Sequence, residues 1–155
     1  LQTIPSLALL AILIPLTGRI GLVPAFIALA VYALLPIVRN THAGLRQVPA
    51  GLRQAAQALG LSRRQTLQLV ELPLATPTLL AGIKTSAVLN VGTATIAAFI
   101  GAGGYGERIV TGLALNDHAL LLAGAIPVAL LALGIEAAFR LGERGLLPAG
   151  WRQPR

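Results

Sequence analysis

The sequence predicts an all-α, polytopic membrane protein with about four transmembrane helices and a helical hairpin outside the bilayer. Two observations predict this class. Of the 155 residues, 55% are hydrophobic and only 11% are charged, whereas about a quarter of the residues of an ordinary soluble domain are charged. The charged residues lie between long apolar segments, so the net charge of +7 indicates membrane orientation rather than nucleic-acid binding.

Four apolar segments are candidates for membrane spans. Their lengths are judged against the roughly 20 residues that a helix needs to cross a hydrocarbon core of about 30 Å. They cover residues 1–16, 22–38, 74–100 and 119–139. The first segment is short on its own. Prolines within the segments, such as Pro36 and Pro127, are tolerated where neighbouring helices satisfy the freed backbone groups. Because Pro36 lies near the end of its segment, it predicts a kink or a stop.

Basic residues are concentrated in two connections, and this sets the predicted orientation. They are Arg39, Arg46, Arg53, Arg63 and Arg64 between the second and third segments, and Arg140, Arg144, Arg152 and Arg155 after the fourth. The two opposite connections contain only Arg19 and Arg108 as basic residues. Lys and Arg mark the cytoplasmic side of a membrane protein. We therefore expect the chain to begin inside, to cross four times and to end with a cytoplasmic C-terminus.

The sequence contains no set of residues typical of an enzyme or a metal site. It has no cysteine and only two histidines, which excludes disulfides and Cys-based metal sites. It also has no Gly-x-x-x-x-Gly-Lys-Ser/Thr loop, so the chain is not expected to hydrolyse ATP, nor to bind a cofactor directly. The chain opens without Met or a basic n-region. We interpret residues 1–155 as one transmembrane domain that lacks its N-terminal part.

Residues 40–73 lie on the predicted cytoplasmic side and are too many for a structureless connection, since such loops rarely exceed about 15 residues. Pro49 suits the first position of a helix, and Gly60 suits the position just past its end. Between them, four apolar residues at helical spacing share one face. These are Leu52, Ala55, Ala56 and Leu59.

A second helix is predicted to follow. Ser62 can cap it, and Gln65 can complete a capping box. It is expected to end near Glu71, before the Leu72-Pro73 pair, because the residue before a proline disfavours the helical conformation. The small residues of the hairpin allow another surface to approach closely, which predicts that a partner protein binds it. The alternative is an amphipathic hairpin that lies on anionic lipid.

The hairpin resembles the EAA loop of binding-protein-dependent ABC importer permeases. The signature of that loop is Glu-Ala-Ala, then Gly, then a Leu-Pro pair. Here it reads Gln54-Ala55-Ala56, Gly60 and Leu72-Pro73, with Gln54 in place of the acidic residue. Three further stretches are similar to the glycine betaine, choline and carnitine branch of the family, and they are residues 2–8, 77–83 and 100–106.

The resemblance implies a type I ABC importer permease whose residues 40–73 are a coupling loop for a separate ATP-binding subunit. ATP would be bound by that subunit. The implied docking residues are Gln54, Ala55, Ala56, Leu59, Gly60, Leu72 and Pro73. A second permease subunit, identical or different, and an extracytoplasmic solute-binding protein or domain complete the implied assembly. The assembly would be located in the bacterial or archaeal plasma (inner) membrane.

The predicted solute, glycine betaine, choline or a related quaternary amine, follows from the family branch alone. An importer permease for an amino acid or another small solute is one alternative, and a membrane scaffold without transport is another. An ion-coupled secondary transporter is a third. Such a transporter usually has ionisable residues at mid-membrane, whereas Lys84 and Glu136 lie off the centres of their segments.

Polar residues within the apolar segments have two interpretations. Asn90, Thr93 and Thr95 either line a solute path or support helix packing. Glu136 and Arg140 are four residues apart, which predicts an ion pair along one helix rather than a proton relay. Residues 101–106 are rich in glycine and predict a tight bend on the outer side, because glycine tolerates positive φ.

Overall fold

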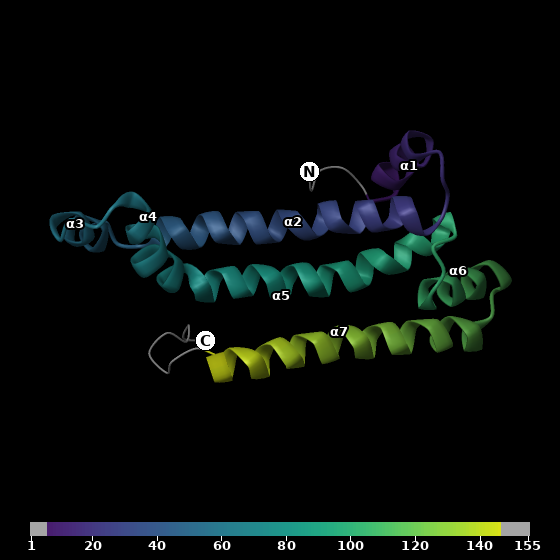
Figure 1. The fold of residues 1–155 in the computed structure, drawn as a ribbon. Coiled ribbons are helices and arrows are strands. Elements are labelled where there is room, and N and C mark those ends of the chain that lie inside the picture. The colour runs from purple at the N-terminus through teal and green to yellow at the C-terminus, as the bar shows by residue number, and fades with distance from the viewer. Residues whose placement is uncertain (1–5, 147–155) are drawn as a thin grey trace.

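The structure, a computed structural model, describes residues 6–146, and every regular element in this part of the chain is helical (Figure 1). This confirms the all-α prediction. The elements are α1 (Ser6–Thr17), α2 (Leu22–Gln47), α3 (Ala50–Ala58), α4 (Arg63–Thr66), the π-helical turn η1 (Leu67–Glu71), α5 (Leu72–Ile96), the 3-10 turn η2 (Ala97–Ile100), α6 (Tyr105–Leu115) and α7 (His118–Leu146).

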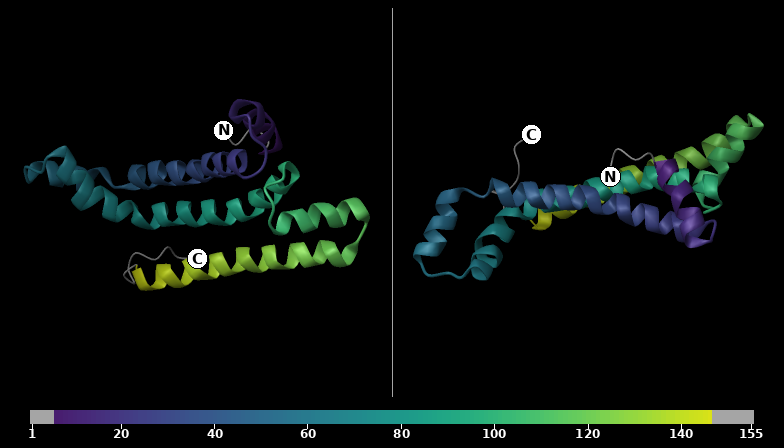
Figure 2. Two further views of the ribbon diagram at one scale, coloured as in Figure 1. Left: turned by 45° about the vertical axis from the view of Figure 1, so that its right-hand side comes forward. Right: turned by 90° about the horizontal axis from the view of Figure 1, so that it is seen from above.

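The three long helices α2, α5 and α7 lie side by side, with α5 between the other two (Figure 1, Figure 2). The short helices α3 and α4 lie together at one end of this bundle, and α1 and α6 lie at the other end (Figure 1). The chain passes toward the α3 end in α2, returns in α5 and passes toward the α3 end again in α7. The hairpin and the end of α7 are therefore on the same side.

Three helical stretches in residues 6–146 are long and apolar enough to cross a membrane, and they are Leu22–Gln47, Arg63–Ile100 and His118–Gly142. The helix α1 has 12 residues, which at 1.5 Å per residue span about 18 Å. This is short of the hydrocarbon core of about 30 Å. The described residues therefore give three crossings rather than the expected four. Residues 1–5 of the predicted first segment lie outside the described part.

Two helices run past the ends of the predicted apolar segments. The helix α2 continues to Gln47, beyond the segment end at residue 38, and α7 continues to Leu146, beyond the segment end at residue 139. Loss of apolar character marks where a helix leaves the bilayer, not where it ends, because long polar side chains have helix propensities close to that of leucine. Pro36 lies inside α2 without stopping it, and the Asn40 amide donates to the Pro36 carbonyl over 2.8 Å.

The α2–α5 seam is the contact of Gly82, Ser86 and Asn90 on α5 with the facing residues of α2. A Cβ atom added to Gly82 would lie 2.6 Å from the Cβ atom of Asn40, so glycine permits this close crossing. Further along α5, Ser86 Oγ and Asn90 Nδ2 donate to main-chain carbonyls of α2 at 2.8 Å and 3.3 Å. Close approach and hydrogen bonding across the helices thus join α2 and α5 along several turns.

At the bundle end opposite α3, the chain reverses through a glycine bend. Gly101, Gly103 and Gly104 have φ values of 75°, 77° and 82°, which confirms the predicted tight bend. The helix α6, which the sequence analysis did not predict, follows this bend. A Cβ atom added to Gly112 would lie 2.6 Å from the main-chain nitrogen of Leu121, so α6 lies directly against α7.

The helix α7 is the most exposed of the three spans. Only 6% of its most apolar window is buried, so most of its apolar surface is available to lipid or to another subunit. Near its end, Arg140 Nη2 lies 2.8 Å from Glu136 Oε1. This confirms the predicted ion pair along one helix face.

Candidate functional site

The helix α3 ends in a well-defined turn. Gly60 has a φ of 77°, and its N–H donates to the Gln57 carbonyl over 2.9 Å. The next N–H, that of Leu61, donates to the Ala56 carbonyl over 3.1 Å. This pair of bonds is the Schellman motif that favours glycine after a helix. The prediction that Gly60 lies just past the helix end is confirmed.

The helix α4 begins with the predicted capping box. Ser62 Oγ accepts from the Gln65 main-chain N–H over 3.4 Å, and Gln65 Oε1 accepts from the Ser62 N–H over 2.9 Å. The two side chains thus satisfy donors at a helix start that have no partner within the helix.

The prediction that the second hairpin helix ends before Leu72-Pro73 is wrong. Leu72 has helical φ and ψ angles of −62° and −49°, and its N–H donates to the carbonyl of Leu67, five residues back. This π turn is wider than an α-turn and gives space to the proline ring, which would otherwise clash with the preceding turn. Helical structure therefore runs without a break from Arg63 to Ile100, over 38 residues.

The predicted docking residues divide into two groups. Those on α3 and its end, Gln54, Ala55, Leu59 and Gly60, are exposed, and only Ala56 is buried. Leu59 is 82% exposed and Leu52, on the same predicted face, is 45% exposed. The apolar face of α3 is therefore largely free of packing within this chain. Leu72 and Pro73 instead lie at the start of α5, at the base of the hairpin.

Arg53 connects α3 to both membrane helices at its base. Its Nη2 donates to the Leu45 carbonyl in the last turn of α2, and its Nε lies 2.8 Å from Glu71 Oε1 at the end of η1. Sequence reasoning missed Glu71 as a partner. One signal was present: Glu71 is the sole acidic residue of the segment 40–73, which also contains four arginines.

A cavity of about 640 Å³ lies between α3 and η1. Most of its lining residues are polar, and the lining consists of Arg53, Gln57, Leu61, Arg63, Thr66, Leu67 and Glu71. The hairpin is thus not filled by an apolar core.

A larger, mostly apolar groove of about 830 Å³ lies within the membrane part of the bundle. It is bounded by α2, α5, the glycine bend, α6 and α7, and Asn90 and Thr95 are among its lining residues. Phe26 and Tyr105 contribute aromatic rings to it. A single chain therefore presents an open groove that reaches two of the three predicted polar residues of α5, Asn90 and Thr95, whereas Thr93 is not among the lining residues.

The three predicted path residues have different surroundings. Asn90 Nδ2 donates to the Leu29 carbonyl over 3.3 Å, while Asn90 Oδ1 is buried and has no hydrogen-bond partner among the described residues. The Thr93 hydroxyl donates to the Leu89 carbonyl over 3.0 Å and that of Thr95 to the Gly92 carbonyl over 2.7 Å, both within α5. Asn90 therefore supports helix packing through its Nδ2 atom, while its Oδ1 atom has no hydrogen-bond partner among the described residues.

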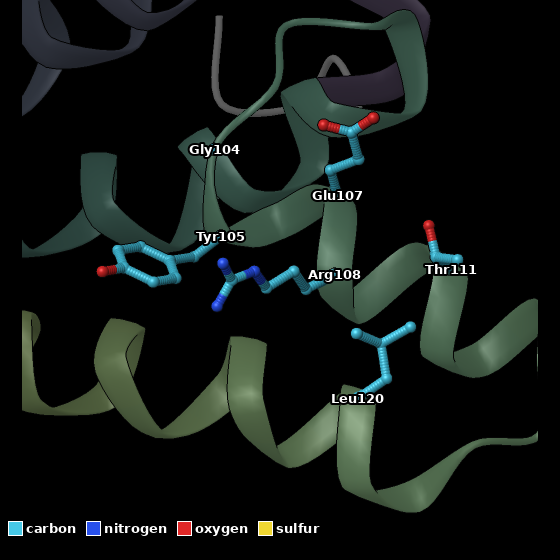
Figure 3. A pocket seen from close by; sticks show the side chains of 6 residues that line it. All are labelled: Gly104, Tyr105, Glu107, Arg108, Thr111 and Leu120. Atoms are coloured by element: carbon cyan, nitrogen blue, oxygen red, sulfur yellow. The ribbon is translucent and has the colours of Figure 1, made fainter.

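A smaller, more polar pocket of about 530 Å³ lies at the end opposite the hairpin. Figure 3 shows the Arg108 guanidinium directed toward the Tyr105 ring, with Glu107 pointing away from both. The Arg108 Cζ atom lies 5.7 Å from the ring centroid, a distance typical of a cation–π contact. Asp117, the other acidic residue near this end, accepts from the Ala119 N–H over 2.9 Å and so caps α7.

With three spans, an exposed hairpin at one end and an open membrane groove, the chain has the features of a transport component. Residues 1–147 match the model of the family described as binding-protein-dependent transport system inner membrane component. The chain belongs to this family, and it is accordingly a multi-pass inner-membrane protein.

Two curated relatives and one solved structure show which members of the family this chain is similar to. The choline transport system permease protein OpuBB of Bacillus subtilis (strain 168) is 46% identical over 153 residues, which cover 99% of this chain and 70% of that protein. The osmoprotectant import permease protein OsmW of Salmonella typhimurium is 43% identical, with 98% and 73% covered. An inward-facing structure of the MetNI methionine ABC transporter aligns with a TM-score of 0.84 at 27% identity, with 94% and 70% covered.

These comparisons confirm the predicted family and the fold of a type I ABC importer permease. They favour an ATP-driven importer over an ion-coupled secondary transporter, since the aligned structure is that of an ABC transporter. They also disfavour a scaffold without transport, since the family is one of transport components.

Proposed function

We propose that the chain is the membrane-spanning permease subunit of an ATP-driven importer for glycine betaine, choline or a related quaternary amine. The observation that carries this proposal is similarity along nearly the whole chain. Permeases named for choline, for glycine betaine, carnitine and choline, and for carnitine are 44–46% identical over 96–100% of this chain. The structure named for methionine is 27% identical. An amino-acid importer is therefore the second candidate.

The hairpin is proposed as the docking site for a separate ATP-binding subunit. It extends beyond the membrane part of the bundle, and the face of Leu52, Ala55 and Leu59 is exposed. The helical run from Arg63 to Ile100 has 38 residues and measures about 57 Å. This exceeds the hydrocarbon core of about 30 Å. Movement of the docked hairpin would therefore tilt α5 within the membrane.

The solute path is proposed to follow the groove along α5. Asn90 and Thr95 line it, and Thr93 lies between them on the same helix. The unpaired Asn90 Oδ1 supports this assignment, because a buried polar atom without a partner is costly in a membrane unless it meets one during function. The exposed surface of α7 and the open groove suit a second permease subunit, identical or different, that closes the path.

The orientation of the chain is proposed from the arginine distribution. Arg39, Arg46, Arg53, Arg63 and Arg64 are at the hairpin end of the bundle, where α7 also ends. Lys and Arg mark the cytoplasmic side, so the hairpin and the C-terminus are both cytoplasmic. The glycine bend and α6 then face an extracytoplasmic solute-binding protein or domain. ATP binds to the partner subunit alone.

The test is reconstitution of the full-length permease with its ATP-binding subunit and solute-binding protein in proteoliposomes. Uptake of radiolabelled choline and glycine betaine is measured with ATP, with ATP after collapse of ion gradients, and with an ion gradient alone. The proposal predicts uptake in the first two conditions, with competition by carnitine and none by methionine. Uptake that needs the ion gradient and continues without ATP would contradict it.

A further inference from the structure

We propose that Arg53 is a positioning residue for transport, whose guanidinium joins the docking helix α3 to the cytoplasmic ends of both α2 and α5. A movement of α3 then reaches both membrane helices together. The inference deepens the proposed function and rests on it. It is argued from the contacts of Arg53, from the sparse packing beneath α3 and from the position of the π turn.

The contacts of Arg53 span three elements. Nη2 donates to the Leu45 carbonyl, in the last turn of α2, where carbonyls carry partial negative charge and lack partners within the helix. Nε lies 2.8 Å from Glu71 Oε1, but without an aligned hydrogen bond, so this contact is a pairing of charges. The guanidinium is planar and rigid and can contact two acceptors at once. One group therefore fixes α3 relative to α2 and α5.

Apolar packing beneath α3 is sparse in the described residues. Ala56 is buried, whereas Leu59 is 82% exposed. The space between α3 and η1 is the cavity of about 640 Å³, which Gln57 and Arg63 line together with Arg53 and Glu71. A close-packed interior transmits displacement because it is nearly incompressible, and a polar cavity does not. Displacement of α3 is thus passed on by the contacts of Arg53 and along the chain itself.

The continuous helix from α4 to α5 contains a turn at which it bends readily. The turn η1 is a π turn of five residues, Leu67–Glu71, and Pro73 supplies no N–H to the turn before it. Helices bend most readily at such places. Bending at this turn reduces the displacement that α4 alone passes on to α5. The contact with Arg53 instead reaches Glu71, the last residue of the π turn and the neighbour of α5.

The Arg53–Glu71 pair is partly buried, since the two side chains are 37% and 20% exposed. Gln retains hydrogen-bonding groups at either position, so Arg53→Gln and Glu71→Gln are expected to fold. Retention of the ATP-binding subunit checks that the hairpin is intact in each variant.

The experiment uses the full-length permease assembled with its ATP-binding subunit and binding protein in proteoliposomes. Three quantities are measured for each variant: retention of the ATP-binding subunit, ATP hydrolysis and choline uptake. Arg53→Gln and Glu71→Gln are expected to retain the subunit and hydrolyse ATP, while choline taken up per ATP falls about tenfold. The double variant is expected to be no worse than the more impaired single variant, because both act through one contact.

Arg64→Gln is the matched control, since Arg64 is an exposed arginine of the same hairpin. Its uptake per ATP is expected to equal that of the wild type. A second pair of variants replaces the ionic contact by a covalent one. These 155 residues contain no cysteine, so Arg53→Cys and Glu71→Cys together can be joined by a short, reducible bifunctional thiol reagent. Joining restores the link between positions 53 and 71 but not the contact with Leu45. Uptake per ATP is therefore expected to rise above that of the unjoined variant, and reduction is expected to lower it again.

Wild-type uptake per ATP in Arg53→Gln and Glu71→Gln would overturn the inference and leave the proposed function intact. So would a joined double-cysteine variant whose uptake per ATP does not rise above that of the unjoined variant. A wild-type complex that shows no ATP-dependent uptake would overturn the proposed function and the inference with it.

Discussion

Along the α2–α5 seam, Gly82 brings two helices so close that an added Cβ atom would lie 2.6 Å from Asn40. At the other extreme, α3 lies over a polar cavity of about 640 Å³, and Leu59 at its end is 82% exposed. The seam is packed within one chain, whereas the apolar face of α3, with Leu52 and Leu59, is exposed. The difference shows that α2 and α5 are packed tightly against each other, and the exposed face of α3 supports the proposal that another subunit covers it.

Gly82→Ala should have the largest effect and should break the seam. Its methyl group would meet Asn40 Cβ and, at 3.0 Å, the main-chain oxygen of Pro36. Overpacking of this kind costs about 1–3 kcal/mol. Gly92→Ala on the same helix is the control, because nothing lies within 4 Å of the added atom and alanine improves helix propensity by up to about 1 kcal/mol. Thermal unfolding of the purified permease should shift in opposite directions, and equal shifts would contradict a close-packed seam.

Ser62→Ala should have an intermediate effect that is confined to the hairpin. It removes the capping box at the start of α4, which costs about 1 kcal/mol. Hydrogen exchange should become faster at the Gln65 amide and stay unchanged at the amides of the seam. Ser62→Asp, which keeps a capping oxygen, should exchange like the wild type. Faster exchange that spreads along α2 and α5 would show that hairpin and seam are not separate units.

Asn90→Leu should have the smallest effect on stability. It loses one hydrogen bond between helices, worth about 0.6 kcal/mol in membranes, but it also removes the unpaired Oδ1 atom. If Asn90 lines the solute path, uptake should fall several-fold while the thermal unfolding temperature hardly changes. The control is Thr85→Val, since that hydroxyl donates within α5 to Ala81. Unchanged uptake in Asn90→Leu would assign Asn90 to packing alone.

Features that depend on neighbouring residues were predictable from the sequence. The glycine after α3, the capping box of Ser62 and Gln65 and the Glu136–Arg140 pair each involve residues within a few positions of one another. Backbone conformation and hydrogen bonding over one turn decide them, so a single sequence contains the necessary information.

Features that depend on distant contacts were not predictable. The pairing of Arg53 with Glu71 requires the hairpin to close first, although the single acidic residue among arginines was a clue. The helix continues through Pro73 because a π turn precedes it, and turn width has no simple sequence signal. The ends of α2 and α7 could not be predicted from the apolar segments, because the apolar pattern reports the bilayer boundary rather than the helix end.

The central claim, that the α3 hairpin binds the ATP-binding subunit, is tested most directly by co-purification of that subunit with wild-type, Gly60→Asn and Gly60→Pro permeases. Gly60 has a φ of 77°, which asparagine tolerates and which proline, fixed near −65°, cannot adopt. The account predicts that the wild type and Gly60→Asn retain the subunit and that Gly60→Pro loses it. Equal retention by Gly60→Pro, or no retention by the wild type, would contradict the account.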